Sequence, residues 1–197
     1  MDERAIRVCV IGDELVAGVG DPRGLGWVGR VAARTPAASL TMLQLAVPGE
    51  TTAELSQRWD AEVSRRVSPE ADNRLVIGLG RADLEAGISP ARSRLNLANV
   101  LDIAQRRGIE AFVVGPPPGG PHTDAVGELS AAFADVTTRR QIPYVETFAP
   151  LVTHEQWAAD LAAGDGALPG QAGYGLLAWL VLHSGWHQWL GLPSDSA

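Results

Sequence analysis

Carboxylates are the side chains in this sequence whose types and positions could do chemistry. Asp13, Glu14, Asp83 and Asp165 each lie in a short turn-like segment. Glu14 and Asp165 could pair for acid–base work, or Glu14 could join Asp13 and Asp83 in a site for a hard cation. In the structural alternative, Glu14 is a favourable anion at a helix N-terminus and Asp13 is a turn residue. The four residues alone leave these interpretations open.

Histidines offer one further candidate base. His122 follows an apolar run closely enough to approach a cleft formed by the segments that carry these carboxylates. A single His in a proline-rich loop is, however, more often a surface residue. His183 and His187 are four residues apart but lack the Glu of the zinc-binding pattern His-Glu-x-x-His. The glycines between positions 18 and 26 precede no Lys and do not form a dinucleotide fingerprint, so they read as turn glycines. We therefore expect no metal and no cofactor.

Apolar runs rich in Val, Ile and Leu predict the elements that must position these residues. They indicate five strands, at Ile6–Val10, Leu40–Ala46, Leu75–Leu79, Ala111–Val114 and Pro143–Val145. Stretches with helical spacing lie between and after them, at about Trp27–Arg34, Thr51–Val67, Pro90–Arg107, Asp124–Arg139, His154–Ala163 and Gly170–Leu190. Unbroken apolar strands that alternate with helices indicate a parallel sheet covered on both faces.

The expected fold is a three-layer α/β/α sandwich of flavodoxin-like type. Its five-stranded parallel sheet should have the strand order 2-1-3-4-5, and residues 1–197 should form a single domain. In such a sheet the loops after the strands gather at one edge, so ligand chemistry should lie there. The proline-rich segment 115–121, after the fourth strand, should be a stiff loop.

Composition excludes several classes of partner. A formal net charge of -7 and a pI of about 5.0 argue against nucleic acid. Cys9 is the only cysteine and lies in an apolar run, so we expect neither a disulfide framework nor a thiolate metal site. No apolar run reaches the roughly 18 residues that a membrane span needs, and the start of the chain does not resemble a secretory signal. We expect a cytoplasmic protein with no membrane span.

Four short segments that follow expected strands or lie near the end of the chain share an order and a spacing. They are Gly12-Asp13-Glu14-Leu15, Pro48-Gly49-Glu50-Thr51-Thr52, Gly80-Arg81-Ala82-Asp83 and Asp165-Gly166-Ala167-Leu168-Pro169. Together they resemble the conserved blocks of the SGNH, or GDSL-type, hydrolases, a family of esterases and lipase-like enzymes. The resemblance runs from Ile6 to Ala178 and includes the proline-bearing turn after the fourth strand.

The resemblance implies a role for each position in the first three blocks. The first block of the family ends in Gly-Asp-Ser with Ser as the nucleophile, and here Glu14 stands at that place. Gly49 corresponds to a Gly whose backbone N–H helps to bind the oxyanion. The third block normally reads Gly-x-Asn-Asp with the Asn as a second oxyanion donor, and here Ala82 replaces that Asn before Asp83. Loss of one such donor typically costs about 10²–10³ in turnover.

The last block of the family implies a His base that this chain lacks. Asp165 matches the Asp that orients the His, but Leu168 stands where the His should be. Leu cannot accept a proton, and Glu14 has no proton for a base to remove. Because Ala82 and Leu168 are apolar replacements, they suggest lost rather than exchanged chemistry, and we favour the structural interpretation of Glu14.

Two main functions follow as hypotheses. In the first, the chain is a pseudoenzyme that binds a small acyl or ester ligand, or a protein, through the inherited cleft. In the second, it is an active hydrolase of altered mechanism that uses Glu14 and Asp165. A third class, a pure interaction protein, predicts a plugged cleft and tryptophans that bury in a partner or a second copy. For Trp179 we expect core packing, while Trp186 and Trp189 could form a dimer or ligand contact.

Overall fold

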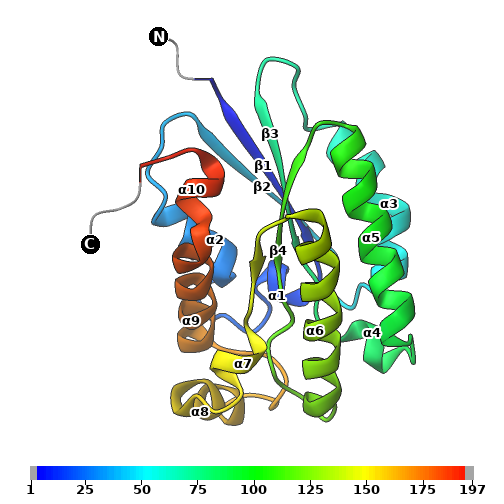
Figure 1. Ribbon diagram of the computed structural model, residues 1–197. Helices are drawn as coiled ribbons and strands as arrows, with labels where there is room; N and C mark the ends of the chain where they lie inside the picture. Colours follow the sequence, from blue (N-terminus) through cyan, green and yellow to red (C-terminus); the bar gives the residue numbers. More distant parts are fainter. Residues whose placement is uncertain (1–3, 194–197) are drawn as a thin grey trace.

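A five-stranded, wholly parallel sheet forms the centre of the computed structural model, which describes residues 4–193 (Figure 1). Its order is β2-β1-β3-β4-β5, so the predicted order 2-1-3-4-5 is confirmed. The register aligns Gly12 of β1 with Ala46 of β2 and Gly78 of β3, so these three strands end side by side. The strands are β1 Ile6–Gly12, β2 Leu40–Ala46, β3 Asp72–Gly78, β4 Glu110–Val114 and β5 Tyr144–Val145.

Local capping explains where several helices begin and end. Thr51 caps the longer helix after β2 through a capping box, in which its hydroxyl accepts the Glu54 N–H and the Glu54 carboxylate accepts the Thr51 N–H at 2.9 Å. Ser89 caps the helix that begins with Pro90, whose missing N–H costs nothing in the first turn. The longer helices are α2 Gly26–Ala33, α3 Thr52–Ser64, α5 Pro90–Arg106, α6 Thr123–Arg140, α8 Glu155–Ala162 and α9 Gln171–Val181.

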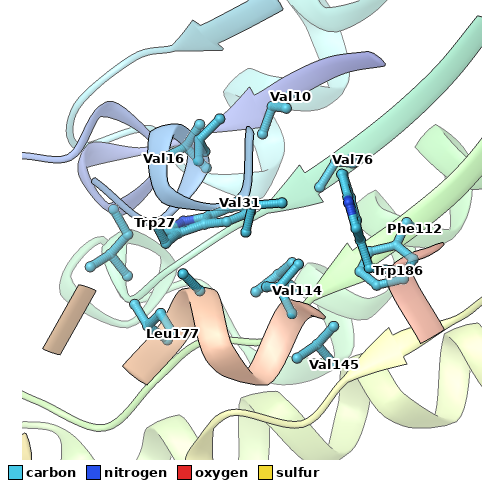
Figure 2. Close-up of a cluster of buried hydrophobic side chains, with 14 of the residues drawn as sticks. Val10, Val16, Trp27, Val31, Val76, Phe112, Val114, Val145, Leu177 and Trp186 are labelled. Carbon is cyan, nitrogen blue, oxygen red and sulfur yellow. The ribbon is translucent and has the colours of Figure 1, made fainter. Parts of the chain in front are cut away.

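Two hydrophobic cores lie on the opposite faces of the sheet, because successive side chains of a strand point in opposite directions. On one face, Val8 and Val10 pack with Trp27 and Leu177 from α2 and α9. Figure 2 shows part of this cluster, with Val76 and Val114 of neighbouring strands in the same layer. On the other face, Cys9 and other strand residues pack against α3, α5 and α6. The predicted three-layer α/β/α arrangement is therefore confirmed.

The C-terminal helix differs from the prediction of one continuous helix over Gly170–Leu190. After α9, a π-helical turn at Leu182–Trp186 contains non-helical backbone at Ser184 and Gly185, and α10 spans His187–Leu190. Gly185 has a φ of 84°, which is a left-handed conformation that glycine adopts at little steric cost. The helical spacing of apolar residues on both sides concealed this break.

The break also reverses the expectations for the tryptophans. Trp179, expected in the core, is 51% exposed and stacks on His183 with ring centroids 4.1 Å apart. Trp186 and Trp189, left open as partner contacts, are buried and pack against Phe112. Figure 2 shows Trp186 beside Phe112. Trp179 precedes the break, on a face of α9 that the rest of the fold leaves uncovered, and the turn at residues 184–185 redirects the chain so that Trp186 and Trp189 enter the core.

Short helices gather at the end of the sheet where the strands finish. They are α1 Glu14–Ala17, whose start the structural interpretation of Glu14 anticipated, and α4 Ala82–Glu85 and α7 Phe148–Leu151, which the sequence did not predict; Figure 1 shows them in its lower half. α1 and α4 carry the first and third of the segments singled out above. Among the described residues no helix has the length and apolar character needed to cross a membrane.

Candidate functional site

The turn after β1 places Asp13 and Glu14 at the start of α1. Gly12 has a φ of 152°, and a Cβ there would collide with the carbonyl oxygen of Gly78, so only glycine allows the two strand ends to lie this close. Asp13 is the N-cap, and its Oδ1 accepts the Leu15 N–H at 3.0 Å. Glu14 is the first residue of α1, as the structural interpretation expected.

Asp13 is fully buried, and its carboxylate is only partly satisfied. The Oδ2 atom has no hydrogen-bond partner and lies against Gly80, where any side chain would clash with it. Burial, and then the neighbouring Glu14 carboxylate, raise the pKa of Asp13 to about 7, while the backbone N–H groups of Leu15 and Gly80 and then the charge of Arg81 act in the opposite direction. Because no surface of Asp13 is exposed, it cannot contact a ligand directly and can act only through its charge.

Glu14 bonds directly to the second block. Its Oε2 accepts the backbone N–H of Gly49 at 2.7 Å, across 35 positions of sequence. Gly49 has a φ of 77°, and this left-handed backbone turns its N–H toward α1. The residue at the nucleophile position therefore occupies the N–H that the resemblance assigns to oxyanion binding. A bound anion at that N–H would have to displace this carboxylate.

Asp83 has a structural environment. Its Oδ1 and Oδ2 accept the backbone N–H and the hydroxyl of Thr52, both at 2.6 Å, and the Asn96 amide donates to the same hydroxyl at 2.9 Å. All three residues are buried, so Asp83 ties α4 to the first turn of α3. Ala82 beside it is buried and offers only a methyl group where an oxyanion donor was expected.

Asp165 bonds only within its own loop. Its Oδ1 accepts the N–H groups of Ala167 at 2.8 Å and Leu168 at 2.9 Å, and these bonds hold the pKa of this exposed carboxylate below its usual value. Leu168 is half-buried and packs against the core that contains Trp27. Within residues 4–193, no hydrogen bond joins Asp165 to Glu14. The two carboxylates proposed as an acid–base pair are thus engaged separately.

Arg81 is a site residue that the sequence motifs did not single out. It follows β3 and is buried, with only 5% of its surface exposed. Its Nε has no hydrogen-bond partner. Its charge lowers the pKa of both Asp13 and Asp165, so its guanidinium lies within electrostatic reach of both loops. The sequence feature that could have indicated Arg81 is its position in a short block whose other residues are Gly80, Ala82 and Asp83.

The other candidate residues lie outside this constellation. His122 is exposed and precedes α6, and no described hydrogen bond links its ring to Glu14, Gly49 or Asp165. The Nδ1–H of His183 donates to the Trp179 carbonyl oxygen at 2.7 Å. Within residues 4–193 no three His, Cys, Asp or Glu side chains are grouped so that they could hold a metal ion.

The glycine-rich turn after α1 is organised by Asp21. This buried carboxylate accepts the N–H groups of Arg23, Leu25 and Gly26 and forms an ion pair with Arg30, which together hold its pKa well below the usual range. Gly18, Gly20, Gly24 and Gly26 all have positive φ, as turn glycines do. The segment is therefore a structural turn built around one carboxylate.

Hollows in the surface lie beside the site and far from it. One of about 370 Å³ borders Gly49 and is lined by Val47, Pro48, Glu54 and neighbouring residues of α3. Beneath the first block, a cavity of only about 10 Å³ between Leu15 and Leu177 shows a tightly filled interior. Two hollows of about 480 and 390 Å³ meet at Trp189, near the start of β4, and none of the predicted site residues lines them. The hollow at Gly49 is smaller than these two, but it borders Gly49, which is one of the predicted site residues.

Comparison with known proteins places this geometry in a family. Residues 10–176 match the model of the GDSL-like lipase/acylhydrolase family. A lipase/acylhydrolase from Enterococcus faecalis superposes with a TM-score of 0.77 at 22% identity, covering 98% of this chain and 100% of that one. Axe2, an acetylxylan esterase from Geobacillus stearothermophilus, gives 0.79 at 16% identity, covering 98% and 99%.

A third similar structure is the psychrotrophic esterase EstA from a Pseudoalteromonas species. Its TM-score is 0.71 at 20% identity, covering 94% of this chain and 98% of that one. A search of curated protein sequences found no match. The structural likenesses establish the fold, and the family model covers most of the sequence, including the first three blocks and the loop at Asp165. The chain therefore belongs to the GDSL-like lipase/acylhydrolase family.

Proposed function

We propose that this chain is a family member without ordinary Ser-His-Asp hydrolysis, and that its inherited cleft binds a small acyl-type ligand. The observation that carries the proposal is the 2.7 Å hydrogen bond from the Gly49 N–H to Glu14. A hydrolytic site needs that N–H free for charge that develops on the substrate. Here a permanent carboxylate takes it, at the position where the family carries its nucleophile.

The other two replaced positions support the same proposal. Leu168 packs into the hydrophobic core, so no base stands in the last block. Ala82 is buried and presents no donor. Asp165, which would orient a His, instead stabilises its own turn. A working ester hydrolase of this type would need the base, the second oxyanion donor and a carboxylate that orients the base. Under the proposed function, positions 168, 82 and 165 do not supply them.

The class of ligand follows from the family. The similar structures include a lipase/acylhydrolase and an acetylxylan esterase, whose names point to acyl and acetyl groups. The hollow beside Gly49 offers about 370 Å³, which is the scale of a small-molecule site. An acyl or ester ligand that binds without being cleaved is therefore the proposed partner, in a cytoplasmic protein.

Hydrolysis of p-nitrophenyl acetate by the purified chain tests the loss of catalysis. We expect a rate equal to the buffer background. Hydrolysis above background that disappears in Glu14→Ala would overturn the proposal and support the altered mechanism that uses Glu14 and Asp165. If the protein elutes from a sizing column as a stable assembly and does not bind the ester, an interaction protein is favoured instead.

Restoring the family residues sharpens this test. The triple variant Glu14→Ser, Ala82→Asn, Leu168→His supplies nucleophile, donor and base, and we expect it to gain esterase activity. The matched control keeps Leu168 and carries only the first two changes. Because a positioned base contributes roughly 10²–10⁴-fold, the triple variant should exceed the control by about 10²-fold. Equal rates in folded triple and control proteins would contradict the assignment of position 168.

A further inference from the structure

Arg81 holds a buried positive charge at the edge of the sheet where the site lies. It stands between β3 and α4, with 5% of its surface exposed, and its Nε has no hydrogen-bond partner. Its Nη1 lies 2.9 Å from where a Cβ would sit on Gly119 and 3.0 Å from where one would sit on Gly120. Two glycines in the proline-rich loop therefore leave the room that the guanidinium fills.

Other well-buried arginines of this chain are paired. The Arg30 side chain is 11% exposed and forms an ion pair with Asp21. The Arg74 side chain is 10% exposed and pairs with Asp72 at 2.7 Å and with Glu110. Among the described residues, no carboxylate lies within ion-pair distance of Arg81. An unpaired buried charge is unfavourable, so its place in the fold calls for a partner from outside.

The carboxylates nearest to Arg81 are engaged elsewhere. Asp13 caps α1 through Leu15, and Asp165 closes its own turn. Asp83 uses both oxygens on Thr52. Arg81 is the last of the charges and hydrogen bonds that shift the pKa of Asp13 and of Asp165, as expected for a through-space effect without contact. Each of these carboxylates therefore has a hydrogen-bond partner other than Arg81.

We propose that Arg81 binds the carboxylate of a small organic acid that enters this cleft. A guanidinium presents a planar fork of N–H donors that matches a carboxylate in a bidentate pair. The position agrees with the rule that ligands of parallel α/β sheets bind at the carboxyl ends of the strands. Arg81 is only 5% exposed, which allows contact with the end of a small molecule rather than with the surface of a macromolecule.

A carboxylate fits better than a phosphate because of the surrounding charge. Asp13 and Asp165 lie within electrostatic reach of Arg81, and each additional negative charge on a ligand would meet the repulsion of their carboxylates. A singly charged, planar anion minimises that repulsion. This inference rests on the proposed binding function and names its ligand class, namely a short-chain carboxylate rather than an uncharged ester alone.

Direct observation of the Arg81 side chain tests the proposal in the native chain. In ¹⁵N-labelled protein, the Arg81 Nε–H signal is assigned by its absence in Arg81→Gln. We expect propionate to move this signal in a saturable manner, while propionamide, which has the same size without charge, leaves it in place. Inorganic phosphate should shift it less than propionate at equal concentration. No saturable shift with propionate, an equal effect of propionamide, or a larger effect of phosphate would overturn the proposal.

Thermal unfolding provides a second readout. Propionate at ten times its Kd should raise the Tm of the native chain by about 3–6 °C and leave that of Arg81→Gln unchanged. The matched control is Arg92→Gln, at an exposed position of α5, which should respond as the native chain does. If Arg81→Gln does not fold, Arg81→Met replaces it, and the signal in the native chain still decides the question. A full Tm rise in a folded variant without Arg81 would overturn the proposal.

The ester assay separates this inference from the proposed function. Hydrolysis that depends on Glu14, together with a propionate-sensitive Arg81 signal, would reject the loss of catalysis and retain the carboxylate site. A protein that does not hydrolyse the ester and whose Arg81 signal does not respond to propionate would retain the loss of catalysis and reject the carboxylate site.

Discussion

The turn at Asp13–Glu14 and the loop at Asp165–Leu168 carry the first and last family blocks, and they hold their carboxylates differently. In the first, Glu14 reaches a different element and binds the Gly49 N–H, while Asp13 is fully buried. In the second, Asp165 is exposed and bonds only to its own loop, two and three residues away. The Glu14 carboxylate thus connects two segments of the site, and the Asp165 carboxylate connects none, although a backbone bond from the Gly120 N–H to the Gly166 carbonyl at 2.9 Å joins its loop to the proline-rich loop.

This difference shows what the side chains at positions 14 and 168 do in this chain. At position 14 the side chain engages the hydrogen-bond donor of a neighbouring segment, so a direct bond joins the first two blocks. At position 168 the side chain packs against the hydrophobic core, and the Asp165 carboxylate bonds only within its own loop. Loss of the Glu14 carboxylate should therefore reach the second block, whereas loss of the Asp165 carboxylate should stay local.

The pH dependence of stability is the largest expected contrast between the two regions. The pKa of Asp13 is raised from 3.8 to about 7 in the folded protein, so the folded state binds the proton more tightly than the unfolded state. Its contribution is fully present below pH 3.8 and is lost as the pH rises through 7. From pH 4 to 8, the free energy of unfolding of the native chain should fall by up to about 4 kcal/mol more than that of Asp13→Asn.

Asp165→Asn is the matched control, because its carboxylate has the opposite shift. The pKa of Asp165 is lowered, so any stability that it contributes is present at neutral pH and is lost as the pH falls. Urea unfolding at several pH values measures both variants. Parallel pH curves for the native chain and Asp13→Asn would contradict the buried, proton-binding state of Asp13.

The sequence predicted the frame of the fold much better than the details of the site. Alternation of apolar strands and helices was sufficient for the parallel sheet, because unbroken apolar strands indicate burial on two faces. The strand order followed from the flavodoxin-like fold type that this alternation resembles. The apolar pattern failed at Gly185, where a single left-handed residue breaks a helix without interrupting the helical spacing of apolar residues. Trp179 was expected in the core but is exposed on α9, and Trp186, left open as a partner contact, is buried beyond the break.

Within the site, the motifs located the loops but not the contacts. The hydrogen bond between Glu14 and Gly49 joins residues 35 positions apart and depends on a rotamer and on the left-handed Gly49 backbone, neither of which a sequence pattern encodes. The sequence also could not predict the role of Arg81, because that role depends on its burial without a hydrogen-bond partner for its Nε. Asp83 looked like a possible cation ligand until Thr52 was seen to satisfy both of its oxygens.

Removal of the Asp83 carboxylate should have the next largest effect, because Asp83 fixes the β3 side of the site to α3. Asp83→Ala leaves the buried N–H and hydroxyl of Thr52 without their acceptors. We expect the free energy of unfolding to fall by about 2–3 kcal/mol in urea titrations. Glu128→Ala, at an exposed position on α6, is the control and should change it by less than about 0.5 kcal/mol. Equal effects of the two changes would mean that Asp83 does not secure this junction.

Glu14→Gln tests the smallest step, the contribution of charge to the bond with Gly49. The Gln amide oxygen can still accept the Gly49 N–H, so stability should change by less than about 1 kcal/mol. Because the Glu14 charge raises the pKa of Asp13, its removal should lower that pKa toward, but not to, its ordinary value, since burial remains. Carboxyl ¹³C titration measures this shift. In Glu14→Ala, which has no acceptor, the Gly49 amide proton should also move upfield by NMR. If the Gly49 signal is the same in the native chain and both variants, the hydrogen bond that connects the first two blocks does not form in solution. The contrast with the Asp165 carboxylate, which bonds only within its own loop, is then lost.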